Sequence, residues 1–222
     1  MKMPPHPETP GRLITFEGIE GSGKTTQLEA LSRALAKLGV PVVTSREPGG
    51  TPLGEAVRRL VLDTAFANMS ARAELLLYLA SRAEHVDHVI LPALESGSLV
   101  LCDRFSEATL AYQAYGRGLE LDHVESLVSF SARDLHADLV VLLDLPIEEG
   151  LRRIGGRLSM NRVDRETAAF HQRVRDGYLA LAAREPERIA LIDARESPDD
   201  IHRAILERVA PLYQSISIRS AS

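Results

Sequence analysis

The sequence predicts an α/β fold in which a parallel β-sheet is covered by helices on both faces. The first observation is an alternation, because short apolar runs with the length of buried strands are separated by segments of helical length. The second observation is a glycine-rich loop, which stands between the first apolar run and the first helical segment. The predicted strands are Leu13–Phe16, Val42–Thr44, Leu99–Cys102, Leu139–Leu143 and Ile189–Ile192.

The first helix is the most clearly marked element between the strands. Leucines at helical spacing follow the glycine-rich loop: Leu28, Leu31, Leu35 and Leu38. Gly39 and Pro41 then supply a stop signal. The longest helical stretch is expected from about Ala71 to Glu95. Further helices are predicted at Glu107–Tyr115, Leu121–Ala132, Ile147–Arg153, Arg165–Arg184 and Pro198–Val209.

Composition excludes several classes of protein. The chain has 222 residues, 45% of them hydrophobic and 26% charged, which is typical of one folded domain and not of a disordered chain. A net charge of −5 removes the simplest electrostatic case for a nucleic-acid partner. No apolar run approaches the roughly 20 residues that a membrane helix needs. A cytoplasmic protein is therefore expected, with the proline-rich residues 1–11 as a disordered tail.

Cysteine and histidine give no sign of a disulfide or a metal site. The single cysteine, Cys102, ends an apolar run and is predicted to be a buried strand residue. His85 and His88 lie three apart on a predicted helix, but no third metal ligand is near them in sequence. We therefore assign no histidine to metal binding or catalysis.

The stretch GIEGSGKT, residues 18–25, matches the phosphate-binding pattern G-x-x-x-x-G-K-[ST]. Glycines let successive backbone N–H groups turn toward a phosphate chain, and the following helix N-terminus adds its partial positive charge. Lys24 is expected to reach the β and γ oxygens, while the Thr25 hydroxyl binds Mg²⁺. A glycine-rich turn without a ligand is the alternative, and the strand before and helix after disfavour it. The predicted ATP-binding loop comprises Gly18, Ile19, Glu20, Gly21, Ser22, Gly23, Lys24, Thr25 and Thr26.

A phosphate loop alone leaves the phosphoryl acceptor open. GTPases, ATP-driven machines and kinases all use it. The chain has no Asn-Lys-x-Asp string for reading guanine and no transporter-type LSGGQ string. The kinase alternative therefore gains support.

Four further segments, in this order along the chain, resemble the thymidylate kinase family, which moves a phosphoryl group from ATP to dTMP. They are REPGGTPLGE at 46–55, ELLLYLASR at 74–82, CDRFSEATLAYQAYGRG at 102–118 and an arginine-bearing segment at about 150–164. The likeness extends from about Leu13 to the C-terminal helix. It implies a P-loop NTPase fold, a three-layer sandwich with a five-stranded parallel sheet. One kinase domain is expected at 12–215, with a lid at about 150–164 and a flexible C-terminus at 216–222.

The Asp-Arg pair follows a predicted strand, at the sheet edge where open α/β folds bind ligands. The resemblance implies that Arg104 holds the acceptor phosphate, and arginine suits this task because its planar fork binds phosphate oxygens bidentately. It also implies that Asp103 supports Mg²⁺, directly or through water. A local ion pair at a strand end is the alternative.

The same resemblance implies an acceptor pocket for dTMP. Glu20 matches the residue that meets the sugar 3′-hydroxyl, and Tyr112 the residue that excludes a ribose 2′-hydroxyl. Tyr78 and Arg82, four apart on one helix face, match positions that stack on the pyrimidine and bond its O4. Core packing of Tyr78 with a surface Arg82 is the alternative for that pair. The remaining expected dTMP contacts are Arg46, Glu47, Pro48, Thr109 and Gln113.

The lid resembles that of the bacterial subtype, in which the phosphate loop lacks an arginine and the lid supplies one. Arg157 matches the lid arginine that reaches the transferring phosphoryl group, with Arg153 and Arg162 as neighbours and Arg153 on the ATP side. Three departures from the family pattern bear on lid closure and turnover. Ala108 replaces the usual serine, Gly155 a common lid arginine and Asn161 an aspartate.

The expected activity is phosphorylation of dTMP to dTDP with ATP and Mg²⁺ in dTTP biosynthesis, with Lys24, Arg104 and Arg157 as catalytic residues. Two alternatives stay open: a kinase for another small nucleoside or nucleotide, and a slow or inactive nucleotide-binding regulatory homologue. The family also implies a homodimer. Leu75, Leu76 and Leu79 fit its helix interface, although core burial explains them equally well.

Overall fold

Five parallel strands form the centre of the computed structural model, which describes residues 11–155 and 161–219. Their order across the sheet is β2-β3-β1-β4-β5. The strands are β1 (Arg12–Glu17), β2 (Val42–Arg46), β3 (Leu99–Asp103), β4 (Leu139–Asp144) and β5 (Ile189–Asp193). Each contains the run predicted for it, so the predicted α/β fold with a parallel sheet is confirmed.

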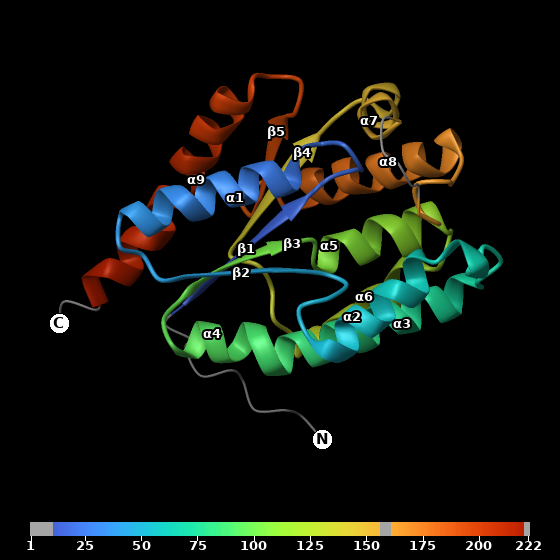
Figure 1. Cartoon of the computed structure of the whole chain (residues 1–222), viewed down its shortest axis with the longest axis horizontal. Coiled ribbons are helices and arrows are strands. Elements are labelled where there is room, and N and C mark those ends of the chain that lie inside the picture. Colours follow the sequence, from blue (N-terminus) through green and yellow to red (C-terminus); the bar gives the residue numbers. More distant parts are fainter. Residues whose placement is uncertain (1–10, 156–160, 220–222) are drawn as a thin grey trace.

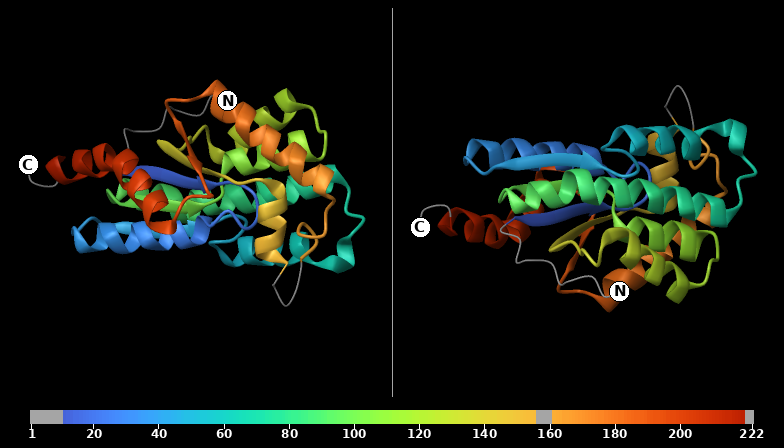
Figure 2. Two further views of the ribbon diagram at one scale, coloured as in Figure 1. Left: turned by 90° about the horizontal axis from the view of Figure 1, so that it is seen from above. Right: turned by 90° about the horizontal axis from the view of Figure 1, so that it is seen from below.

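The central strand β1 positions the site. It pairs with β3 on one side and β4 on the other, and Phe16 is in register with Asp103. Because the strands are parallel, Glu17, Asp103 and Asp144 all end at the same edge of the sheet. Figure 2 shows α1 (Lys24–Lys37) and α8 (Ala168–Arg184) on opposite sides of the sheet, which explains why the strands are apolar on both faces.

Helix α1 buries its leucine stripe as predicted, with one exception. Leu28, Leu31 and Leu35 are buried, but the helix ends at Lys37 and Leu38 is 60% exposed. Helix α1 also packs against α9 (Pro198–Arg219), which continues past its expected end at Val209.

The long predicted helix from Ala71 to Glu95 is one continuous helical segment, which runs along the bottom of Figure 1. It consists of α3 (Ala71–His85), a π-helical turn η2 (Val86–Ile90) and α4 (Leu91–Glu95). The segment after β3 is built in the same way, from α5 (Ser106–Thr109) and the π-helical η3 (Leu110–Gly116). Such π-turns are frequent at functional sites, and η3 borders the cavity described below.

Helix α2 (Pro52–Leu62) and the short 3₁₀ turn η1 (Thr64–Phe66) were not predicted. The start signal for α2 is present in the sequence, because Thr51 Oγ1 accepts a hydrogen bond from Gly54 N at 2.9 Å and a proline follows it. The predicted helices at α6 (Leu121–Ala132) and α7 (Ile147–Ile154) are present, and α8 begins a few residues later than expected.

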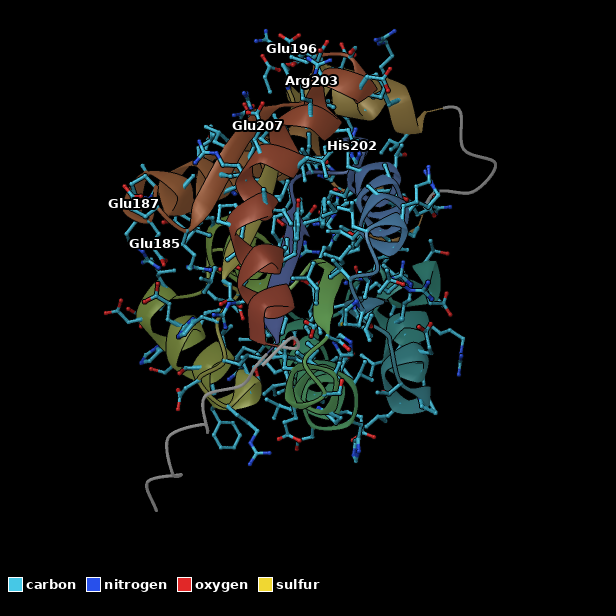
Figure 3. The ribbon with its side chains drawn as sticks, turned by 90° about the vertical axis from the view of Figure 1, so that its left-hand side faces the viewer. Glu185, Glu187, Glu196, His202, Arg203 and Glu207 are labelled. Carbon is cyan, nitrogen blue, oxygen red and sulfur yellow. The ribbon has the colours of Figure 1, made fainter. Side chains whose placement is uncertain are left out.

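The outer face of the molecule is charged. Figure 3 shows this face along α9 and the turns before and after β5, where Glu187, Glu196, Arg203 and Glu207 are exposed. Cys102 is fully buried in β3, as predicted. Among the residues that the structure describes, no helix combines the length and the apolar character that a membrane span requires.

Candidate functional site

A cavity of about 430 Å³ opens at the carboxyl edge of the sheet, within the usual size range of small-molecule sites. The phosphate loop lines one part of it. The ends of β2 and β3, helices α2, α3, α5 and α7, the turn η3 and residues 161, 163 and 164 line other parts. Most of the predicted site residues lie here: Glu20, Gly21, Gly23, Lys24, Thr25, Thr26, Arg46, Glu47, Pro48, Tyr78, Arg82, Asp103, Arg104, Thr109, Tyr112, Gln113 and Arg153. Gly18, Ile19 and Ser22 are in the loop behind this lining. Arg157 lies outside the described residues.

The phosphate loop has the backbone that its glycines predict. Gly18, Gly21 and Gly23 have φ values of 133°, 79° and 94°, which residues with a Cβ rarely adopt. At Gly21 a Cβ would also lie 2.7 Å from the carbonyl oxygen of Gly150 in α7. No side chain of the residues that the structure describes caps the start of α1, so its first N–H groups are available to an anion.

Lys24 is buried at the centre of this loop. Its Nζ donates hydrogen bonds to Gly18 O at 3.1 Å and to Ile19 O at 2.8 Å. Burial, with help from the charge of Arg104, lowers the pKa of Lys24 to about 8, although nearby carboxylates act in the opposite direction. A polyanion in the cavity would favour the charged form of this side chain.

Thr25 and Asp103 bring two oxygen ligands together at the base of the cavity. The Thr25 hydroxyl donates to Asp103 Oδ2 at 2.8 Å, which joins the first turn of α1 to the end of β3. Hydroxyl and carboxylate oxygens are the ligands that Mg²⁺ prefers, and it binds through few protein groups beside substrate phosphates. This pair therefore fits a magnesium ion.

Arg104 holds a strained position between the phosphate loop and η3. Its φ of 72° is unusual for a residue with a long side chain, and its backbone N–H donates to Phe16 O at 3.0 Å. Its Nη2 donates to Glu20 Oε1 at 2.7 Å, and Tyr112 donates its hydroxyl to Glu20 Oε2 at 2.7 Å. Burial acts to raise the pKa of Glu20, but the charges of Arg104 and Lys24 outweigh it and lower that pKa. Glu20 is therefore the counter-ion of Arg104, and an anionic ligand that binds Arg104 would have to displace it.

Two residues beneath Arg104 were not predicted from the sequence. Glu17 is fully buried and accepts hydrogen bonds from Phe105 N and from the Tyr178 hydroxyl, both at 2.7 Å. Tyr178 accepts in turn from Arg104 Nη1 at 3.2 Å. Burial, reinforced by the nearby charge of Glu107, raises the pKa of Glu17 to about 7. The only sequence signal was the position of Glu17 at a strand end.

Arg82 and Tyr78 lie on the side of α3 that lines the cavity. The alternative, with Tyr78 packed in the core and Arg82 on the surface, is therefore wrong for this pair. Arg82 is 2% exposed, and its Nη2 donates to Phe105 O at 2.8 Å and to Thr109 Oγ1 at 2.9 Å. Its Nε donates to Glu47 Oε2 at 2.8 Å. The guanidinium is thus locked, with Nη1 as a buried donor that has no partner among the described residues.

Two further arginines line the cavity, one at the end of β2 and one on α2. Arg46 is half-exposed and pairs with Glu55 at 3.0 Å. Arg58 of α2 lines the cavity and donates to Pro48 O at 3.1 Å. Burial and the neighbouring charge of Arg46 lower the pKa of Arg58. Arg58 was missed because α2 itself was missed, although its helix carried a start signal.

Glu74 forms a buried junction behind the cavity. It accepts hydrogen bonds from Gln113 Nε2 at 2.8 Å, from Arg117 Nε and Nη2 at 3.0 Å each, and from Arg162 Nη2. Arg162 also donates to Val61 O at 2.8 Å and does not line the cavity. Arg162 was expected as a neighbour of the lid arginine Arg157, which lies outside the described residues. The Arg162 side chain lies in this junction, where it has a buried counter-ion.

Arg153 is the predicted lid-side residue that reaches the phosphate loop. It donates to Gly21 O at 3.3 Å and to Ala194 O at 3.2 Å, and it pairs with Glu149 one turn earlier. Asn161, where the family has aspartate, accepts hydrogen bonds from the backbone N–H groups of residues 163 and 164 through its Oδ1. Aspartate would offer the same oxygen, so this departure preserves the local turn.

Comparisons with known proteins identify relatives of this chain. A family model described as thymidylate kinase matches residues 16–205. A thymidylate kinase from Desulfovibrio desulfuricans is 50% identical over 195 residues, covering 85% of this chain and 90% of the relative. One from Citrifermentans bemidjiense is 49% identical over 212 residues, covering 93% and 94%. A crystal structure of thymidylate kinase from Ehrlichia chaffeensis superimposes with a TM-score of 0.73 at 34% identity, covering 90% of this chain and 98% of that one.

Proposed function

The chain belongs to the thymidylate kinase family, and on that premise we propose that it transfers the γ-phosphoryl group of ATP to dTMP in the cytoplasm, giving ADP and dTDP for dTTP biosynthesis. One observation carries the proposal for this chain. The phosphate loop with Lys24, and Arg82 with its guanidinium held by Glu47, line a single cavity that Arg104 lines as well. A donor and an acceptor nucleotide held at these two ends would meet at Arg104.

On the donor side, we assign ATP to the phosphate loop, residues 18–26, and to Arg153. Lys24 would exchange its contacts with loop carbonyl oxygens for phosphate oxygens. Thr25, with Asp103 directly or through water, would hold Mg²⁺, which neutralises charge on the β and γ phosphates when it is bound with ATP. Gly23 leaves the start of α1 uncapped for the same anion.

On the acceptor side, we assign dTMP to the residues around Arg104. Arg104 would hold the 5′-phosphate, and Glu20, once released from Arg104, would accept a hydrogen bond from the sugar 3′-hydroxyl. Tyr112 would close the space beside the 2′-carbon, and Tyr78 would stack on the pyrimidine. Arg82, whose buried Nη1 has no partner in residues 11–155 and 161–219, would donate to O4 of the base. Arg46, Glu47, Pro48, Thr109 and Gln113 complete this pocket.

The chemical difficulty of the reaction is the repulsion between two anions. Nucleotide phosphates are ionised near neutral pH, so catalysis comes from positioning and charge neutralisation and needs no strong base. Lys24 and Arg104 supply positive charge from the described residues. We propose that Arg157, carried by a lid at about 150–164, adds charge at the transferring group and that lid closure excludes water.

Transfer of labelled phosphoryl from [γ-³²P]ATP to dTMP tests this assignment. Lys24→Ala and Arg104→Ala should each lose most of kcat/KM, whereas Arg33→Ala, which removes an exposed cation from α1, should be near normal. Arg157→Ala should lower mainly kcat, because its contact is expected to strengthen in the transition state. Near-normal activity in Lys24→Ala or Arg104→Ala would contradict the assignment, and so would a change confined to KM in Arg157→Ala.

We also propose that the enzyme is a homodimer. Leu75 and Leu79 are buried within the protomer, so they do not form the partner surface. Leu76, Leu127 and Phe130, on the packed helices α3 and α6, are 59%, 39% and 80% exposed and are available to a second copy. Sedimentation of the wild type and of Phe130→Arg tests this proposal, which predicts a dimer that the substitution weakens.

A further inference from the structure

Three hydrogen bonds form a chain from the end of β2 to the guanidinium of Arg82. Ser45 Oγ lies 2.6 Å from His85 Nε2, His85 Nδ1 lies 2.9 Å from Glu47 Oε1, and Arg82 Nε lies 2.8 Å from Glu47 Oε2. His85 is fully buried and Glu47 is 5% exposed. Ser45 is half-buried, and the other members of this series lie in the protein interior, where each polar group depends on its partner.

The direction of the central bond follows from the chemistry of its partners. The Glu47 carboxylate only accepts hydrogen bonds, so His85 Nδ1 carries a proton and donates to it in both the neutral and the charged ring. Nε2 then accepts from the Ser45 hydroxyl when the ring is neutral. Burial acts to raise the pKa of Glu47, but Arg82 and His85 together hold that pKa below its ordinary value.

This series of hydrogen bonds, from Ser45 to Arg82, determines the orientation of the Arg82 guanidinium beside the cavity. Glu47 uses one oxygen for Arg82 and the other for His85, so His85 fixes the rotation of the carboxylate that orients the guanidinium. The Arg82 guanidinium also lies 5.1 Å from the centre of the Phe105 ring, and its buried Nη1 has no hydrogen-bond partner within the part of the chain that the structure describes. Arg82 and Glu47 line the cavity, whereas His85 and Ser45 do not. Any effect of His85 on an acceptor must therefore pass through Glu47 and Arg82.

We propose that His85, held by Ser45, is a positioning residue that sets the specificity of the enzyme for the acceptor base. By fixing Glu47, it makes Arg82 present an N–H donor that matches a carbonyl oxygen on the pyrimidine and opposes an amino group at the same position. The inference rests on the proposed function, which puts the base of the acceptor beside Arg82. Close packing of the His85 ring on Gly50, where a Cβ would lie 2.6 Å from Cδ2, holds the ring in this orientation.

Two substitutions of the same residue separate the hydrogen bond from general packing. The amide nitrogen of asparagine has the same bond separation from Cβ as His85 Nδ1, so His85→Asn keeps a donor for Glu47. The amide of glutamine instead matches Nε2, so His85→Gln keeps a partner for Ser45 and loses the donor to Glu47. Both variants remove the ring, and a defect due to packing alone should be similar in the two.

The measurement is kcat/KM for dTMP and for 5-methyl-dCMP, whose base carries an amino group where thymine carries O4. His85→Gln should lower the ratio of the two values by about 10-fold or more, mainly through a higher KM for dTMP, since one charge-assisted hydrogen bond is misaligned. His85→Asn should stay within about 3-fold of the wild-type ratio. The KM for ATP should change little in either variant.

An unchanged ratio in His85→Gln, or an equal fall in both variants, would overturn the inference. Arg82→Met, which removes the N–H donors and the charge, separates this outcome from failure of the proposed function. If Arg82→Met abolishes the discrimination while His85→Gln preserves it, only the role of His85 fails. If Arg82→Met also preserves it, the base does not lie beside Arg82. Should neither His85 variant fold, Ser45→Ala takes their place, with a fall of about 3-fold in the ratio expected and no fall contradicting the inference.

Discussion

Lys24 should gain a proton when ATP binds at mildly alkaline pH. Its pKa is lowered to about 8 in the nucleotide-free protein, mainly by burial. With that pKa, about 90% of the side chain is charged at pH 7 and about 10% at pH 9. Triphosphate oxygens favour the charged form, so binding at pH 9 must include the cost of protonation. The affinity for ATP should fall about tenfold between pH 7 and pH 9, which corresponds to about 1.4 kcal/mol.

The assay is calorimetric titration with a non-hydrolysable ATP analogue and Mg²⁺ at pH 7, 8 and 9. Repeating the titration at pH 8 to 9 in two buffers with different heats of ionisation should reveal proton uptake on binding. Lys24→Arg keeps its charge throughout this range and should not show the fall that the wild type shows, even if its affinity at pH 7 is lower. Because the analogue and buffers are common to both proteins, identical pH profiles for wild type and Lys24→Arg would refute the reasoning.

Three further predictions concern buried groups. Burial raises the pKa of Glu17 from 4.5 to about 7, so the folded state binds this proton more tightly and the free energy of unfolding should fall by about 3 kcal/mol as pH rises from 4.5 to 7. Denaturant unfolding of Glu17→Gln should lack this fall. Parallel stability profiles for the wild type and Glu17→Gln would count against the prediction. Glu74→Gln should lower the free energy of unfolding by about 3 kcal/mol or more, because it removes the buried counter-ion of Arg162. A loss below about 1 kcal/mol in a urea titration would exclude this role of Glu74. Gly150→Ala would place a Cβ 2.8 Å from Glu20 O in the phosphate loop, so steady-state kinetics should show a KM for ATP raised about tenfold. Gly155→Ala is the control, because its Cβ would have its nearest contact at 3.2 Å. Equal KM values for ATP in the two variants would contradict the prediction.

Regular elements could be predicted because their signals are local. The five strands are short apolar runs in the sequence, and the structure extends each by only one or two residues at its ends. Helix α2 was missed because only Val57 and Val61, with Gly54, face the interior, so its apolar stripe is thin. The start of α2 is nevertheless marked in the sequence by Thr51 and Pro52.

The residues of the site also fall into two groups: those that local sequence predicts and those that depend on distant partners. The phosphate loop is contiguous in sequence, so its geometry follows from its glycines and from the strand and helix around it. The Tyr178–Glu17 hydrogen bond joins residues that are 161 positions apart, and no single-sequence pattern connects them. Arg162 shows the related limit, because its counter-ion in α3 is 88 positions away and decides where it lies.

The most direct test of the account is incubation of the purified protein with ATP, Mg²⁺ and a panel of nucleoside monophosphates, with ADP release and the phosphorylated product both followed. The account predicts prompt formation of dTDP from dTMP and little product from CMP, AMP or UMP. Saturable binding of ATP and dTMP without any dTDP would contradict it, as would faster phosphorylation of another acceptor.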